Sequence, residues 1–372
     1  MHTLISILLI LTVSSNPLAY AGNWNKPKVK DFSNPELDQT ARTLVDQLSD
    51  DDIAVGLDLE PYTDVSLRKG RLEVTDQLVR SGRKSLKLTI RPGDCGRPWP
   101  VIPNGWNDCK HGNERIGVNE EKLRTGEWYY TASLYMDEAD FKKRSVSQSH
   151  VNLMQWLDQD PKNGPPFNLL WFPQNEVSYL KLPQTNFPDK FLAVDVRLKS
   201  FIENDPNGNQ SWYPMRLIAA NEPLSNATGL WLDFTVFANW TSQDGGWFIV
   251  AMNDDVVFDY RGQTLELGSK GVAFDVQLYR YGRGDLKARK NGPIPGDHDQ
   301  TMFADNMGVF EDLLSLKGAR PSFSQMAEKL TIQAGQSPRE PASFQPPSKT
   351  NLANVNERYE GCPLTVRCVQ RQ

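Results

Sequence analysis

The sequence predicts an all-β protein, a β-jelly-roll sandwich of two antiparallel sheets with a short N-terminal helix and an irregular, partly helical C-terminal tail. Short segments rich in β-branched and aromatic residues follow one another from residue 58 to about residue 310. Gly, Pro, Asn and Asp separate these segments, as expected for turns between strands. An apolar fraction of 39% is sufficient for one large core.

Eight segments carry the strand signal most clearly. They are SLRKGRLEV (66–74), RKSLKLTIR (83–91), EWYYTASLYM (127–136), FLAVDVRLK (191–199), WLDFTVFANW (231–240), GWFIVAMN (246–253), DVVFDY (255–260) and AFDVQLYRY (273–281). Asn253 and Asp254 tolerate positive φ, so we expect a tight turn there that pairs the segments before and after it.

Helical spacing of apolar residues appears before the predicted sandwich, in ELDQTARTLVDQL (36–48), with Pro35 at the first turn. Two further short helices are expected in EDLLSLKG (311–318) and SFSQMAEKLTIQAG (322–335), followed by a segment whose composition is typical of a disordered linker. We divide the chain into a signal peptide (1–21), an N-terminal extension with a helix (22–57), the jelly roll (58–318) and a partly disordered C-terminal extension (319–372).

The N-terminus has the pattern of an export signal. The apolar stretch LISILLILTV (4–13) is too short to span a bilayer, and Ala19 and Ala21 place small residues where a signal peptidase cuts. A buried apolar helix is the alternative. The pattern predicts a secreted or periplasmic protein without a membrane span in its mature form. A net charge of −5 argues against a nucleic-acid partner.

The cysteines form two close pairs, Cys95 with Cys109 and Cys362 with Cys368. In an oxidising compartment each pair is expected to close a short loop as a disulfide. Zinc binding is the alternative, although neither pair has CxxC spacing and His111 is the only histidine close to either.

Aromatic residues with polar flanks are frequent in the predicted sandwich. They are Trp106, Trp128, Trp156, Trp171, Trp212, Trp231, Trp240 and Trp247, with Tyr129, Tyr135, Tyr179, Tyr279 and Tyr281. On a concave sheet such rings bind sugar rings while neighbouring amides and guanidinium groups bind hydroxyls. The alternative is that they form the core.

Seven motifs occur in an order that resembles one enzyme family. They are DLEPYTDVSLRKGRLEVTDQLVRSGRKSLKLTIRPGD (58–94), GNERIGV (112–118), GEWYYTASLYM (126–136), NLMQW (152–156), LWLDFTVFANWTSQDGGWFIVAMNDDVVFDYRG (230–262), FDVQLYRYG (274–282) and QTMFADNMGVF (300–310). Together they resemble the polysaccharide lyase family that includes heparin lyase I-like proteins. The resemblance implies a jelly-roll fold and β-elimination on a uronic-acid-containing polysaccharide.

β-Elimination requires a group that neutralises the uronate carboxylate, a base, and a donor to the leaving glycosidic oxygen. By resemblance, Tyr279 matches the family's catalytic tyrosine, Gln155 a glutamine on the substrate side, and Arg115 an arginine of the cleft. Trp156, Trp106, His111, Arg280 and Tyr281 are the predicted substrate-binding residues.

Three positions depart from the family pattern. Leu157 stands where related enzymes carry the histidine of QWH, Asp275 replaces a lysine, and Gly117 replaces a glutamate near Arg115. Leucine cannot transfer a proton, and an aspartate disfavours a heavily sulfated substrate. The change at Gly117 suggests that an orienting contact of Arg115 is missing.

His150 is one candidate to replace the lost histidine, although it lies seven positions before Leu157 and would face the other side of a regular strand unless a bulge intervenes. His111 is the second candidate, and His298 has the setting of a turn residue. No cofactor is predicted. A structural calcium at residues 253–255 or 297–299 is the alternative to solvated acidic turns.

Two other functions use the same residues differently. A non-catalytic carbohydrate-binding protein would hold an acidic glycan without cleaving it, and the changes at Leu157 and Asp275 favour this alternative. Glycoside hydrolysis would require two facing carboxylates, such as Glu114 and Asp233. The leading prediction is a monomeric lyase, with Tyr279 as proton donor and, in one version, also as base.

Overall fold

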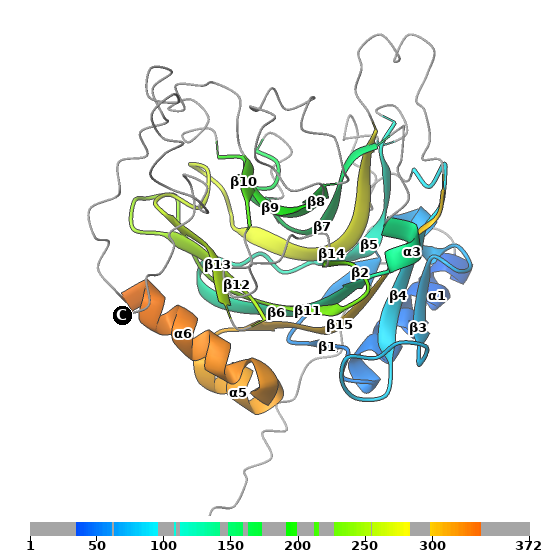
Figure 1. The fold of residues 1–372 in the computed structure, drawn as a ribbon, viewed down its shortest axis with the longest axis horizontal. Helices are drawn as coiled ribbons and strands as arrows, with labels where there is room; N and C mark the ends of the chain where they lie inside the picture. The colour runs from blue at the N-terminus through cyan, green and yellow to red at the C-terminus, as the bar shows by residue number, and fades with distance from the viewer. Residues whose placement is uncertain are drawn as a thin grey trace, which may run out of the picture.

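A computed structural model describes residues 35–61, 63–95, 108, 112–141, 148–158, 163–172, 191–198, 212–215, 227–253, 255–282 and 298–335. Two antiparallel sheets pack face to face, as Figure 1 shows. The predicted jelly-roll sandwich is therefore confirmed. No helix among these residues is both long and apolar enough to cross a membrane.

The larger sheet has the strand order β13-β12-β11-β6-β15-β4-β3, with β1 parallel to β15. Its strands are β1 (Ala54–Val55), β3 (Leu72–Thr75), β4 (Ser85–Ile90), β6 (Gly126–Met136), β11 (Trp231–Trp240), β12 (Trp247–Met252), β13 (Asp255–Arg261) and β15 (Gln300–Phe310). The hairpin predicted at Asn253 joins β12 to β13, and this residue has φ 53°. Its tolerance of that conformation explains the sharp turn.

The smaller sheet has the order β10-β9-β8-β7-β14-β5-β2. Its strands are β2 (Leu59–Pro61), β5 (Glu114–Glu120), β7 (Gln148–Asp158), β8 (Phe167–Phe172), β9 (Phe191–Val196), β10 (Trp212–Pro214) and β14 (Val272–Gly282). Sequence patterns missed β5, β8 and β15 as strands, because buried strands read as continuous apolar runs or are interrupted by polar residues that face inward. The first expected strand was partly wrong, since Ser66 and Leu67 lie in the 3₁₀ helix η1 (Asp64–Leu67).

The main core lies between the two sheets. Along β14, Phe274, Val276 and Leu278 point into it, so the intervening residues face outward from the smaller sheet. Trp156 is also in this core, 1% exposed, and packs edge-on against Tyr130 and Phe248. The prediction that Trp156 contacts substrate is corrected, because its indole is buried on the wrong face of the sheet.

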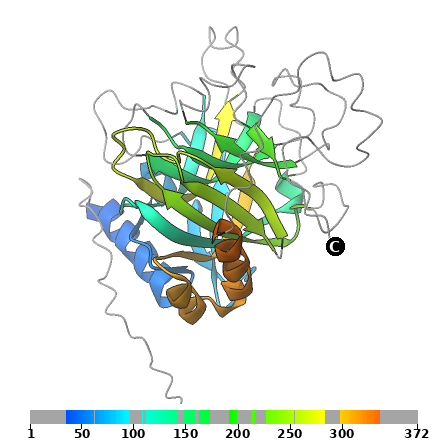
Figure 2. The same ribbon diagram turned by 90° about the vertical axis from the view of Figure 1, so that its left-hand side faces the viewer.

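Helices cover parts of the sandwich. The predicted N-terminal helix is α1 (Pro35–Asp50), which contributes Leu44 and Leu48 to the main core. The short helix α3 (Glu138–Phe141) follows β6. The two predicted C-terminal helices are α5 (Leu313–Ala319) and α6 (Ser324–Gly335), joined by η5 (Pro321–Phe323). Figures 1 and 2 show α5 and α6 against the larger sheet, away from the smaller one.

A second apolar cluster fixes α5 and α6 in place. Phe237, Ile249 and Phe310 of the larger sheet pack against Leu316 and Leu330 of the helices. These helices are therefore integrated with the sandwich. The segment from residue 336 onward lies outside the described residues.

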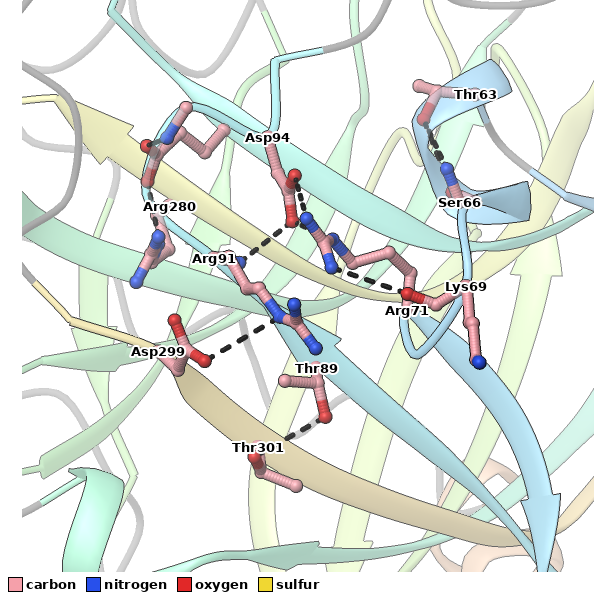
Figure 3. Close-up of polar contacts among 12 residues, drawn as sticks. Thr63, Ser66, Lys69, Arg71, Thr89, Arg91, Asp94, Arg280, Asp299 and Thr301 are labelled. Carbon is pink, nitrogen blue, oxygen red and sulfur yellow. Dashed lines mark hydrogen bonds and ion pairs between the residues drawn. The ribbon is translucent and has the colours of Figure 1, made fainter.

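Hydrogen bonds and ion pairs around Asp94 connect β5 to neighbouring residues of the chain. Figure 3 shows that the Asp94 carboxylate pairs with the guanidinium of Arg71 and accepts a hydrogen bond from the backbone N–H of Arg91. The side chain of Arg91 forms an ion pair with Asp299 at 3.6 Å. The backbone oxygen of Asp94 also accepts the N–H of Arg115 at 2.8 Å. These contacts position the first residues of β5 relative to the larger sheet.

Candidate functional site

The outer face of the smaller sheet gathers most of the predicted site residues. Alternation along β14 places Asp275, Gln277, Tyr279 and Tyr281 on this face, opposite the core-facing side chains. Tyr279 lies in register with Arg115 of β5 on one side and with Asn152 of β7 on the other. The structure thus brings Tyr279 and Arg115 together.

The Tyr279 hydroxyl is held by two residues that precede β5. It donates to Asp108 Oδ1 and accepts from Asn113 Nδ2, both at 2.9 Å. The Arg115 guanidinium carbon lies 3.5 Å from the centroid of the Tyr279 ring, and its Nε lies 3.7 Å from Asp108 Oδ2. The suggestion that Arg115 lacks an orienting contact is therefore wrong, because Asp108 supplies the carboxylate.

The charge state of Tyr279 suits a proton donor. Burial raises the pKa of its hydroxyl well above the ordinary value, and nearby Tyr281 and Asp108 raise it further. Arg115 lowers this pKa but does not outweigh the burial. At neutral pH the phenol is protonated, so it can give a proton and is a poor base.

His150 lies on the same outer face as Tyr279. The register of β7 shifts between Asn152 and Met154, and both Leu153 and Met154 point into the core. This bulge reverses the alternation, so His150 and Gln155 share a face although their separation is odd. His150 pairs in register with Tyr281, and the two rings stack with centroids 4.1 Å apart.

Burial lowers the pKa of His150 well below its ordinary value, and the charge of Arg197 lowers it further. The imidazole is therefore neutral at neutral pH and retains a lone pair that can take a proton. Tyr281 separates it from Tyr279, since the ring centroids of the two tyrosines are 4.3 Å apart. A neutral base and a protonated phenol thus flank Tyr281.

Gln155 lies farther along the sheet. It pairs with Asp275, and its Nε2 donates to Asp275 Oδ2 at 2.5 Å. Asp275 is four residues from Tyr279 on the same strand, a separation of about 13 Å at strand rise. Burial raises the pKa of the Asp275 carboxyl to about 8, despite the opposing hydrogen bond from Gln155. Below that pH, Asp275 is mainly uncharged.

A row of amides links Gln155 to the far side of the sheet. Asn152 Nδ2 donates to Gln155 Oε1 at 3.2 Å and to Asn168 Oδ1 at 2.8 Å. Asn168 in turn donates to Asp195, which pairs with Arg197 at 2.5 Å. The polar side chains of Asn152, Asn168 and Asp195 are almost wholly buried. A hydrogen-bonded row of polar side chains therefore runs along the outer face of the smaller sheet.

Arg280 was predicted to bind substrate, and the structure corrects this. Its side chain is 1% exposed and lies on the inward side of β14, where its Nη2 is 2.5 Å from Glu114 Oε2. It also donates to the backbone oxygen of His298 at 2.6 Å. Alternation explains the error, because neighbours of Tyr279 on one strand face the other way.

The carboxylate pair required for glycoside hydrolysis is absent at the residues suggested for it. Glu114 belongs to the smaller sheet and pairs with Arg280, whereas Asp233 belongs to the larger sheet. Asp233 is engaged there by Arg80 at 2.6 Å and by Ser133 at 2.6 Å. The two carboxylates therefore do not face each other across one site.

Several predicted residues lie outside the described part of the chain. These are Trp106, His111, Cys109, Cys362 and Cys368. Cys95 is disulfide-bonded, and its pairing with Cys109 stays a prediction. Among the described residues, no group of three His, Cys, Asp or Glu side chains is placed to hold a metal ion.

Sequence reasoning missed Asp108, Asn113, Asn152, Arg197 and Gln277. Alternation along the recognised strand would have placed Gln277 beside Tyr279 on the outer face. The position of Asn152 depends on the bulge, and that of Asp108 on a contact with Tyr279, which is 171 residues away in sequence. No local pattern signals either.

Comparison with known families identifies the chain. A family model described as polysaccharide lyase matches residues 54–307. The chain belongs to the polysaccharide lyase family. The matched segment runs from β1 into β15, and it includes the outer-face residues of the smaller sheet. The comparison with curated proteins finds no match.

Several solved structures resemble this polysaccharide lyase family member. An endo-β-1,4-glucuronan lyase from the fungus Trichoderma reesei is 15% identical, with a TM-score of 0.42 over 67% of this chain and 90% of that chain. An alginate lyase from Pseudomonas aeruginosa is 12% identical, with a TM-score of 0.38 over 66% and 87%. A GH131 β-glucanase catalytic domain from Podospora anserina is 13% identical, with a TM-score of 0.40 over 67% and 82%.

Proposed function

We propose that this protein is an exported polysaccharide lyase that cleaves a uronic-acid-containing polysaccharide by β-elimination. Family membership supports the reaction class. The observation that carries the proposal is the Tyr279 hydroxyl, protonated and held by Asp108 beside the Arg115 guanidinium. Elimination needs an acidic proton next to a carboxylate, which a uronate supplies.

Each chemical role has a candidate on the outer face. Arg115 neutralises the uronate carboxylate, which makes the proton on the adjacent carbon more acidic. The neutral imidazole of His150 takes that proton. The electron pair of the broken C–H bond forms a C=C bond as the glycosidic C–O bond breaks, and Tyr279 gives its proton to the departing oxygen.

Asp108 and Arg115 have opposite effects on Tyr279. Arg115 favours the phenolate, whereas Asp108 and burial favour the phenol. Because burial dominates, Tyr279 acts as the acid, and His150 is the base in this proposal. After the step, the proton on the imidazolium is transferred to the Tyr279 phenolate, directly or through water, which returns both groups to their resting states.

A carbohydrate-binding protein without activity is the second candidate. Leu157, which is partly exposed on β7 in register with Ala273, favours it because it supplies no proton-transfer group where related enzymes carry a histidine. In that case the same polar face holds an acidic glycan that remains intact. The two candidates differ only in whether a product forms.

The deciding experiment measures the ultraviolet absorbance of unsaturated uronate products from glucuronan, alginate, pectate and glycosaminoglycans. We expect at least one to be cleaved, and Tyr279→Phe to lower the rate at least about a hundredfold because it removes the proton donor. Retained binding in a polysaccharide affinity gel without product supports the binding protein instead. An unchanged rate in Tyr279→Phe contradicts the assignment of that residue.

Export and the absence of a cofactor complete the proposal. The signal pattern before residue 22 supports export of the mature chain from the cytoplasm, to a compartment where a glycan substrate and an oxidising environment for Cys95 would be available. The roles assigned to Tyr279, His150 and Arg115 require no cofactor, and a monomer suffices for them. The mass of the secreted chain tests the expected cut after Ala21.

A further inference from the structure

Polar atoms between Tyr279 and Asp275 have no hydrogen-bond partner among the described residues. They are both amide atoms of Gln277, Oδ1 of Asp275 and Oδ1 of Asn152. All three side chains are 0% exposed. Buried polar atoms are paired in the great majority of cases, so a concentration of unpaired ones indicates a place for a ligand.

These three residues are neighbours on the outer face. Gln277 is two positions from Asp275 and two from Tyr279, about 7 Å in each direction. Its side chain lies over Gly117, because a Cβ at Gly117 would come within 2.6 Å of the Gln277 Cβ. Asn152 is the partner of Tyr279 on β7, and its Nδ2 is occupied by Gln155 and Asn168. The unpaired atoms therefore border the proposed reaction centre.

The group carries no cation. The guanidinium of Arg115, which acts on the charge of Asp275, is engaged by Asp108 and by the ring of Tyr279. Asp275 is mainly protonated below pH 8 and so adds little charge. A buried neutral site with carbonyl and amide groups suits sugar hydroxyls, whereas a sulfate or carboxylate placed there would lose its hydration without gaining a counter-ion.

We propose that Asn152, Gln277 and Asp275 form a subsite for an uncharged sugar residue, next to the uronate held at Arg115 and Tyr279. This inference rests on the proposed function and narrows its substrate class. The protein then prefers glycans in which a uronate neighbours a neutral sugar over chains that are charged at every unit. Partly exposed Asn119 and Leu157 border the subsite on the adjoining strands.

A matched pair of polymers tests the subsite. Glucuronan carries a carboxylate on every sugar, and partial carboxyl reduction converts some of these sugars to neutral ones in the same chain. For the wild type, we expect the cleavage rate per remaining uronate to be at least about threefold higher on the reduced polymer, and affinity-gel retardation to follow the same order.

Variants separate charge from shape. Asp275→Lys places a cation in the subsite, so the preference should fall to about one or reverse. Asp275→Asn remains neutral and isosteric, so the preference should persist. Gln243→Lys adds the same charge at an exposed turn between β11 and β12 and should behave as the wild type. Gln277→Met, which needs no buried charge, should weaken retardation by the reduced polymer about tenfold.

The outcomes distinguish the two proposals. Cleavage of both polymers at equal rates, with no response to Asp275→Lys or Gln277→Met in folded variants, overturns the subsite and leaves the lyase intact. Preferential retardation by the reduced polymer without any product supports the subsite and overturns the lyase. Neither binding nor cleavage of any uronate polymer overturns both.

Discussion

Tyr279 and Asp108 form a hydrogen-bonded pair whose charge state decides which way a proton moves. Asp108 is 0% exposed, accepts the Tyr279 hydroxyl and also lies beside Arg115. A residue in this position acts through its neighbours, because it orients the phenol and the guanidinium relative to each other. We therefore regard Asp108 as a positioning residue.

Replacement of Asp108 by Asn tests this role. The change removes a negative charge that raises the pKa of Tyr279, so the phenol ionises at lower pH and the basic limb of the rate profile moves down. We expect kcat to fall about tenfold as well, since the amide oxygen is a weaker acceptor for the hydroxyl than the carboxylate. The pH dependence of kcat and KM is the measurement. Asp233→Asn, on the larger sheet, should leave the profile in place, and an unshifted limb in Asp108→Asn would contradict the role.

The carboxyl of Asp275 links the site to stability. Its pKa rises from an ordinary 3.8 to about 8, chiefly through burial, while Gln155 and Arg115 oppose the rise and Glu120 and Glu60 add to it. The folded state therefore binds a proton that the unfolded chain releases between about pH 4 and 8, and stability falls as pH increases through that window.

Asp275→Asn should remove the fall in stability with increasing pH, because an amide does not titrate. We define the difference in Tm as the value for the variant minus the value for the wild type. We expect this difference to be at least about 2 °C larger at pH 9 than at pH 5. Thermal unfolding at both pH values, followed by circular dichroism, measures the difference. A constant difference would show that Asp275 is ionised in the folded protein.

At the scale of single elements, β14 and β5 leave no room for a side chain at Gly117. A Cβ at Gly117 would lie 2.6 Å from both the Gln277 Cβ and the Val276 oxygen, and Gln277 is the residue paired with Gly117 on β14. The absence of the family's glutamate at this position therefore has a packing cause. Gln277 occupies the space that a larger residue would need.

Gly117→Ala should accordingly destabilise the protein by about 1–3 kcal/mol, through overpacking at the centre of the smaller sheet. Gly318→Ala is the matched control. A Cβ there meets nothing within 4 Å, and alanine favours the helix α5. Urea unfolding of both variants gives the comparison. Equal stabilities would show that the strands separate to accept the methyl group.

The same strands show what the sequence could predict. Alternation around Tyr279 was visible, and it correctly separates outer-face Tyr281 from inward-facing Arg280, although the prediction placed both with substrate. The bulge that turns His150 outward adds one residue to β7 and has no signature in side-chain pattern. Asp108 meets Tyr279 across 171 residues of sequence, a contact that local propensity does not encode.

The whole molecule is built in layers, and the layers that stabilise the fold are distinct from the layer that carries the proposed site. The proposed site is on the outer face of the smaller sheet, the main core lies beneath it, and α5 and α6 pack on part of the outer face of the larger sheet (Figure 1). Sequence patterns predicted both helices, but their packing on β11 and β12 depends on distant residues such as Phe237 and Ile249.

Leu330→Ala tests the contribution of this helical layer. Leu330 is 0% exposed in the cluster that joins α6 to the larger sheet, so truncation should leave a cavity and cost about 2–5 kcal/mol of unfolding free energy. Leu314→Ala, at an 80% exposed position on α5, should change the unfolding free energy by less than about 0.5 kcal/mol. Both variants should retain wild-type glycan binding per folded molecule, because the sandwich core lies between the helices and the proposed site. A loss of binding in folded Leu330→Ala would show that the helical layer and the outer face are coupled through the two sheets.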